Sequence, residues 1–68
     1  MKHIIYILLL FVVGDCVEIK GGIFKGQFWT VISTNPDGTY DLKDRDWVLP
    51  NVRASYIAKA EWGKCKDN

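Results

Sequence analysis

The sequence predicts a small all-β protein, a five-stranded antiparallel barrel preceded by an apolar N-terminal segment. Three observations predict it. With 68 residues, the chain has room for a single small domain. From residue 14 onward, short runs of β-branched and aromatic residues are separated by turn signals about every 8–12 residues, the spacing typical of small barrels. No stretch of this part shows the period of an amphipathic helix.

Residues 1–13 form the apolar N-terminal segment and differ from the rest. An unbroken apolar run, residues 4–13, follows Lys2 and His3. This order is typical of a secretory signal peptide, here with cleavage after Gly14. As a helix the run would be about 15 Å long, half of a bilayer core, so a membrane span is not expected.

A buried strand explains the same run equally well, because Ile, Val, Phe and Tyr are good strand formers. A strand that is apolar on both faces needs cover on both, which a partner or a second copy would have to supply. Residues 4–13 therefore direct export, contact a membrane or mediate self-association. Exported or membrane-associated and cytoplasmic locations both stay open.

The barrel is expected over residues 14–62. Its first strand covers residues 16–20, where Val17 and Ile19 alternate with charged residues and so share one face. Two glycines then break the pattern. The second strand covers residues 27–33, which are rich in β-branched and aromatic side chains.

The strongest local signal is the Asn-Pro-Asp-Gly sequence at residues 35–38. Proline presets φ, the Asn and Asp side chains bond to the nearby backbone, and glycine accepts a positive φ, so a reverse turn is expected. It leads into a third strand at residues 39–43, with Tyr40 and Leu42 facing inward. A charged turn follows at residues 44–46.

The last elements are short. A fourth strand at residues 47–49 either ends at Pro50 or lies at the edge of the sheet. Residues 52–55 suit a single tight helical turn. A fifth strand is expected at residues 56–62, and the polar tail, residues 63–68, is expected to be frayed.

The order of these pieces resembles the SH3-like barrel superfamily, in particular its Tudor-like and KOW-like members. The resemblance spans residues 13–61. It rests on Val-Gly-Asp-Cys-Val-Glu at 13–18, Lys-Gly-Gln at 25–27, Val-Ile at 31–32, the turn and strand at 35–42, and the closing residues 52–57. Such barrels bind methylated or proline-rich peptides, RNA, DNA or other subunits. The resemblance therefore implies a fold and a binding module without choosing the partner.

One enzyme family shares this fold, the small plasmid-type dihydrofolate reductase. Its active-site Val-Gln-Ile-Tyr stretch has no counterpart at residues 52–57, so the activity is not expected. The resemblance to that family rests on these residues: Gly14, Asp15, Lys20, Gly26, Gln27, Thr34, Asn35, Pro36 and Gly38.

Composition and motifs give no indication of catalysis. His3 is the only histidine and precedes the barrel. The sequence contains no Ser–His–Asp arrangement, zinc-ligand spacing or phosphate-binding loop. Catalytic residues, a metal and a cofactor are therefore not expected. The aspartates at positions 37, 41, 44 and 46 do not fit a calcium loop and are expected to form a solvated rim.

The candidate binding residues are aromatic and basic. A barrel this small cannot bury all three tryptophans, so at least one is expected on the surface beside basic side chains. The main hypothesis is a site for a protein or peptide partner, and the alternative is nucleic-acid binding, with Lys/Arg on phosphate and tryptophan on bases. The candidates are Phe28, Trp29, Trp47, Tyr56, Lys25, Lys43, Arg45 and Arg53.

Two other observations bear on these hypotheses. Residues 14–68 carry eight basic and eight acidic residues, which argues against a strongly basic nucleic-acid surface. The aromatic residues would serve no binding role if they only plug the ends of the barrel.

Cys16 and Cys65 are candidates for a disulfide. The first and last strands of an SH3-like barrel are neighbours, so the start of one and the end of the other can meet. A bond would close a loop of about 50 residues and agree with export, whereas a reducing cytosol would leave two free thiols.

Overall fold

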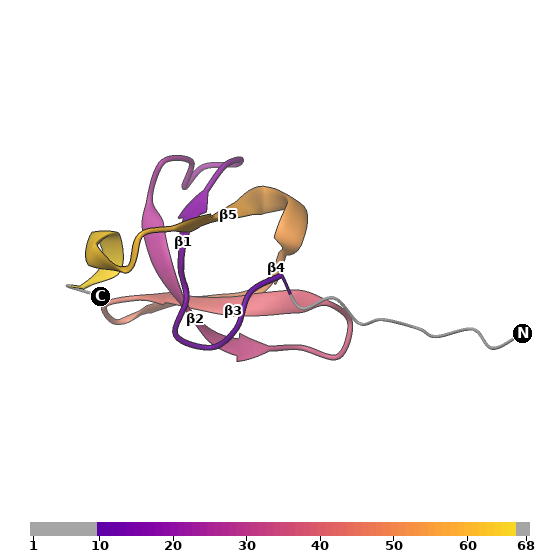
Figure 1. Ribbon diagram of the computed structural model, residues 1–68. Helices are drawn as coiled ribbons and strands as arrows, with labels where there is room; N and C mark the ends of the chain where they lie inside the picture. The colour runs from indigo at the N-terminus through magenta and orange to yellow at the C-terminus, as the bar shows by residue number, and fades with distance from the viewer. Residues whose placement is uncertain (1–9, 67–68) are drawn as a thin grey trace, which may run out of the picture.

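The computed structural model describes residues 10–66, which form an all-β fold built on one five-stranded antiparallel sheet (Figure 1). The strands follow the order β4-β3-β2-β1-β5. Their bounds are β1 (Cys16–Ile19), β2 (Phe28–Thr34), β3 (Thr39–Asp44), β4 (Trp47–Arg53) and β5 (Ile57–Ala60). Two 3₁₀ turns, η1 (Ala54–Tyr56) and η2 (Trp62–Cys65), complete the elements, and the described residues hold no α-helix.

The sheet is strongly bent. In Figure 1, β1 and β5 lie over β3 and β4, and β2 passes from one group to the other. No hydrogen-bonded ladder within residues 10–66 joins the edge strands β4 and β5. The predicted antiparallel all-β class is therefore confirmed, but the sheet is not closed into a barrel by hydrogen bonds.

Strand β4 is longer than the sequence predicts. It continues past Pro50 to Arg53, because β4 is an edge strand and the missing proline N–H removes no ladder bond there. The register against β3 shifts between Tyr40 and Leu42. Asn51, at φ 57°, occupies this irregularity and donates its backbone N–H to Oδ1 of Asp41 at 2.9 Å.

The tight turn and the fifth strand also differ from their expected bounds. The tight turn expected at residues 52–55 forms one residue later, as η1. The fifth strand, expected at residues 56–62, is confined to β5, and Tyr56 and Trp62 belong to the two 3₁₀ turns instead.

The core lies inside the bend of the sheet. It is built from alternate positions of the strands, as the period of two requires. Val17, Val31 and Leu42 are completely buried. The whole cluster consists of Phe11, Val17, Ile19, Trp29, Val31, Tyr40, Leu42 and Ile57.

Phe11 belongs to this core although the sequence places it in the segment before the barrel. Its ring meets the ring of Tyr40 edge to face, with centroids 5.3 Å apart, and its backbone N–H donates to the Tyr40 hydroxyl at 3.4 Å. Its neighbours Leu10, Val12 and Val13 are exposed. The interpretations of the apolar run as a signal peptide, membrane contact or extra strand fall mainly on residues 4–9, outside the described residues. Within residues 10–66, no helix is long and apolar enough to cross a membrane.

The reverse turn at residues 35–38 forms as expected. Gly38 has φ 87° and donates its N–H to the carbonyl of Asn35 at 3.0 Å. Asn35 in turn donates to the carbonyl of Thr39 at 2.9 Å, which closes the β2–β3 hairpin.

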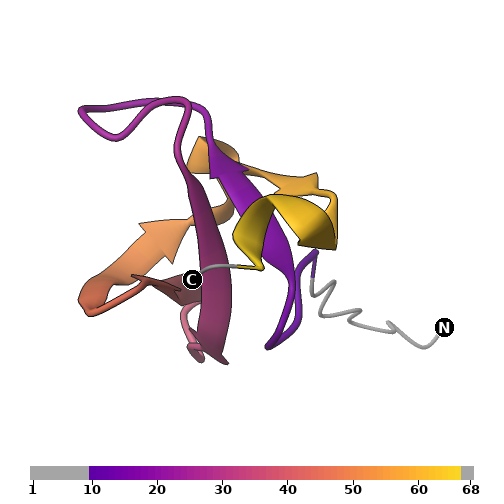
Figure 2. The same ribbon diagram turned by 90° about the vertical axis from the view of Figure 1, so that its left-hand side faces the viewer.

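A disulfide joins Cys16 on β1 to Cys65 on η2, and both residues are buried. Cys65 Sγ also lies 3.3 Å from the carbonyl oxygen of Trp29. Figure 2 shows η2 packed in front of the sheet. Because this bond holds η2 in place, the expectation of a frayed tail is wrong for residues 63–65.

Candidate functional site

An apolar groove lies where the bent sheet stays open, between the β1–β2 loop and β4. Two pockets make up this groove, and both are lined by Phe24 and Leu49. Phe24 comes from the loop and Leu49 from β4. These two side chains therefore form a shared wall, with one pocket on each side.

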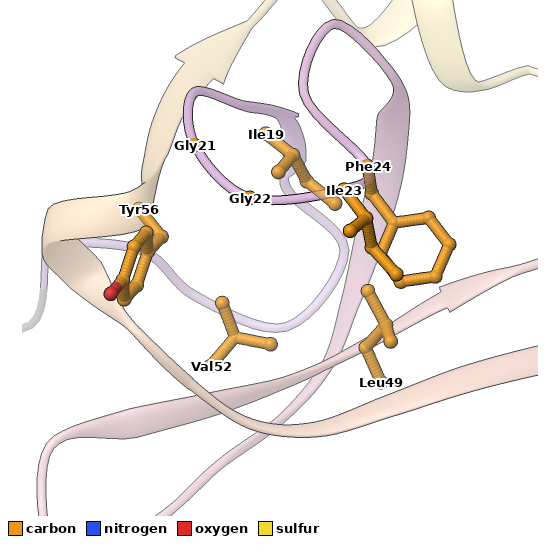
Figure 3. Close-up of a pocket in the computed structure, with 8 residues that line it drawn as sticks. All are labelled: Ile19, Gly21, Gly22, Ile23, Phe24, Leu49, Val52 and Tyr56. Carbon is orange, nitrogen blue, oxygen red and sulfur yellow. The ribbon is translucent and has the colours of Figure 1, made fainter.

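The first pocket, called here the loop pocket, has a volume of about 300 Å³. Figure 3 shows Tyr56 on one side and Phe24 with Leu49 on the other, with Val52 below them. The hydroxyl of Tyr56 is the one polar side-chain atom among its lining residues, so the pocket suits an apolar side chain. The lining residues are Ile19, Gly21, Gly22, Ile23, Phe24, Leu49, Val52 and Tyr56.

The second pocket, called here the tryptophan pocket, has a volume of about 380 Å³ and a different lining. It combines three aromatic rings with the amide of Gln27 and the carboxylate of Asp44. Its lining residues are Phe24, Gln27, Trp29, Asp44, Trp47, Val48 and Leu49.

The β1–β2 loop is held in a defined conformation. Ile19 donates its N–H to the carbonyl of Gln27 at 2.9 Å and accepts one from Gly26 at 2.8 Å. Gly22 and Gly26 have φ values of 82° and 91°, which residues other than glycine rarely adopt. The loop therefore presents Ile23 and Phe24 in fixed positions.

Tyr56 packs closely against this loop. A Cβ added at Gly21 would lie 3.1 Å from Cδ1 of the Tyr56 ring. Lys20 also donates its N–H to the carbonyl of Tyr56 at 2.7 Å, which links the loop to η1. Because Gly21 has no side chain, the Tyr56 ring has room to lie against the loop. In this position the ring forms one side of the loop pocket.

Trp29 is fixed within the tryptophan pocket. Its indole N–H donates to Oε1 of Gln27 at 3.0 Å, and the Phe24 ring lies against it with centroids 5.7 Å apart. Trp29 is only 3% exposed, whereas Trp47 on the opposite strand is 74% exposed. One tryptophan therefore forms the floor of the pocket and the other its rim.

The structure brings only some of the predicted binding residues together. Trp29, Trp47 and Tyr56 line the groove. Phe28 lies on the other side of β2, where Lys64 Nζ is 5.7 Å from its ring centroid. The four basic candidates are exposed but line neither pocket: Lys25, Lys43, Arg45 and Arg53.

Several groove residues are not among the predicted binding residues. Ile23 and Phe24 are apolar residues in a glycine-rich loop, Leu49 belongs to the predicted fourth strand, and Val52 precedes the predicted tight turn. Asp44 reads as part of a charged turn. A hydrophobic pair between glycines that allow positive φ is the one local signal that singles out the loop.

Asp37 and Asp41, near the β2–β3 turn, accept hydrogen bonds from neighbouring residues of the fold. The hydroxyl of Thr39, and then its backbone N–H, donate to Asp37 and hold the pKa of that carboxyl below its ordinary 3.8. The Asn35 side chain, and then the Asn51 backbone N–H, lower the pKa of Asp41 in the same way. Residues 10–66 contain no group of three or more His, Cys, Asp or Glu side chains that could hold a metal ion.

No protein-family model, no curated protein and no solved structure matches this chain. The function must therefore be argued from the groove itself.

Proposed function

We propose that this protein is a non-catalytic binding module that holds an extended peptide segment of a protein partner in the apolar groove. The observation that carries the proposal is the pair of pockets on either side of the Phe24–Leu49 wall. Pockets with mostly apolar linings and few polar groups are the usual form of a ligand site.

Exposed apolar side chains border the groove. Ile23 is 92% exposed, and Tyr56 and Val48 are each 50% exposed. Together with Trp47 they place apolar surface in water along both sides of the opening. A contiguous exposed apolar area of this kind marks an interaction site in soluble proteins.

Two pockets in series suit an extended chain. In an extended peptide, side chains two residues apart point the same way and lie about 6.5–7 Å apart. One side chain would enter the loop pocket and the next but one the tryptophan pocket, across the shared wall. Side-chain pockets of this kind provide the specificity of extended-peptide recognition.

The proposal includes the SH3-like form of the barrel. It is supported by the bent five-stranded sheet, by the pairing of β1 with β5 and by the 3₁₀ turn η1 directly before β5. These features agree with the resemblance carried by residues 13–61.

Two exposed isoleucines provide a matched test. Peptides would be selected from a random displayed library against the full chain with its disulfide intact, and their affinities measured by calorimetry. Ile23→Ser, in the loop pocket, is expected to weaken binding by roughly tenfold or more, the worth of a contacting aliphatic side chain. Ile32→Ser, on β2 outside both pockets, is expected to change it less than about twofold.

A second variant tests the loop pocket without removing a contact. Gly21→Ala brings a methyl group to 3.1 Å from the Tyr56 ring, which must shift, so the selected peptides should bind more weakly. If no library peptide binds, or if Ile23→Ser and Gly21→Ala both bind as the wild type does, the proposal is wrong.

Nucleic-acid binding is the second candidate. Lys25, Lys43, Arg45 and Arg53 are exposed, and none of them takes part in an ion pair within residues 10–66. They would contact phosphates while Trp47 stacks on a base. Affinity for single-stranded RNA or DNA should then fall steeply as salt rises, whereas peptide binding in the groove should respond weakly. The absence of binding at low salt would remove this candidate.

A further inference from the structure

Asp44 is a carboxylate on the core-facing side of β3. Tyr40 and Leu42 are buried in the core, and Asp44 is the next residue of the same alternating series. The cross-strand register pairs Leu42 with Leu49 and Asp44 with Trp47, both on this face. The carboxylate therefore lies at the end of the core, in the lining of the tryptophan pocket.

This carboxylate has no partner in the described part of the chain. Asp44 is half-buried, yet its side chain takes part in no hydrogen bond and no ion pair within residues 10–66. Lys43, its neighbour along β3, alternates to the outer face. A charge brought next to apolar surface is unfavourable unless an opposite charge or a donor reaches it.

The remaining walls of the pocket attract cations. The faces of tryptophan and phenylalanine rings carry negative charge density and favour a cation within about 6 Å of the ring centroid. Trp29 has its indole N–H already bonded to Gln27, so its ring serves as a surface and not as a donor. Trp47 leaves most of its ring open to an incoming group.

We propose that the tryptophan pocket binds the guanidinium group of an arginine side chain. The inference rests on the proposed function, in which the arginine belongs to the bound peptide. A guanidinium is planar, weakly hydrated and carries paired N–H donors, so it stacks on an indole while bonding both oxygens of a carboxylate. The peptide would then place an apolar side chain in the loop pocket and an arginine in the tryptophan pocket.

The pocket can be tested with a small probe. The full-length oxidised protein is titrated with butylguanidinium and, separately, with its neutral counterpart butylurea, while the indole N–H signals are followed by NMR. Butylguanidinium should shift the signals of Trp29 and Trp47 and leave that of Trp62 in place, because Trp62 lies on η2 outside the pocket. No shift with butylguanidinium, or equal shifts with butylurea, would overturn the proposal.

Two neighbouring aspartates supply a matched pair of variants. Asp44→Asn should weaken butylguanidinium binding by about tenfold or more, the usual effect of losing a hydrogen bond to a charged group. Asp46→Asn removes the same charge from an exposed position that lines neither pocket, so it should change binding less than about twofold. Trp47→Ala removes an exposed ring and should also weaken binding. Equal effects of the two aspartate variants would contradict a direct role of Asp44.

Peptides separate this inference from the proposed function. A library peptide with arginine is compared with the same peptide carrying citrulline, which is neutral and nearly the same shape. If both peptides bind equally and depend on Ile23, the arginine inference fails and the groove proposal stands. If butylguanidinium binds but no peptide does, the pocket is confirmed and the peptide proposal fails.

Discussion

Removing the disulfide should cost the protein a large part of its free energy of unfolding. The bond joins residues 49 positions apart. In the chain-entropy description, a loop of that size contributes about 4 kcal/mol at 25 °C by restricting the unfolded chain. A domain of this length has a free energy of unfolding of roughly 3–10 kcal/mol in total. The double variant Cys16→Ser, Cys65→Ser should therefore lose a large part of this stability, from about 40% of the upper value to all of the lower one.

Equilibrium unfolding in urea at 25 °C measures this effect. Tryptophan fluorescence reports the transition because Trp29 is buried in the core and becomes exposed on unfolding. Linear extrapolation yields the free energy of unfolding of the wild type and of the double variant. The expected difference is about 4 kcal/mol.

Reduction provides the control. A thiol reductant should lower the stability of the wild type to that of the double variant and leave the variant itself unchanged. A difference below about 1 kcal/mol, with the fold intact by NMR, would refute the loop-closure reasoning. A reductant effect on the double variant would show that the loss has another source.

Three further predictions concern single positions. Phe11→Ala should lower the free energy of unfolding by about 3–5 kcal/mol, whereas Val12→Ala, at an exposed side chain, should change it by less than about 0.5 kcal/mol, both measured in urea. Gly38→Ala forces a side chain to φ 87° and should cost about 1–2 kcal/mol by thermal or urea unfolding, while Gly63→Ala, in open space without a positive φ, should be nearly neutral. Because hydrogen bonds lower the pKa of Asp41 below 3.8 in the folded state, its contribution is present above that pH and is lost as the pH falls through the lowered value. The urea midpoint should therefore decrease from pH 5 to pH 2.5 (values chosen to bracket the titration), and less so for Asp41→Asn; an equal decrease in both would contradict this assignment.

Local patterning was enough to predict most of the sheet. The alternation at Val17 and Ile19 and the Asn-Pro-Asp-Gly turn depend on nearby residues, and the structure confirms both as β1 and the β2–β3 turn. The length of β4 was not predictable in this way. Whether Pro50 ends a strand depends on which side of that strand carries a partner, and this follows from the order of strands in the sheet.

The groove depends on contacts between distant parts of the chain. Trp29 was expected at a binding surface and does line a pocket, but as a buried floor held by Gln27. Phe24 and Leu49 meet only because the sheet bends and stays open. Asp44 could be assigned to a turn from the sequence, but its inward direction became visible only through its register with Trp47.

The Phe11 position could not be predicted for a different reason. Residues 4–13 are apolar throughout, so no periodicity distinguishes a residue that enters the core from those that do not. Among residues 10–13, Phe11 enters the core and contacts Tyr40 edge to face, while Leu10, Val12 and Val13 are exposed.

The irregularity in β4 has a consequence for how this protein behaves at high concentration. An exposed edge strand offers its free N–H and C=O groups to other chains and can start aggregation. In β4, Pro50 has no N–H, and the N–H of Asn51 is turned toward Asp41. Two successive donors in the middle of the strand are thus withheld from any neighbouring molecule. Another copy cannot extend the sheet across β4 with an unbroken ladder, so templated pairing is disfavoured at this edge while the groove beside it stays accessible.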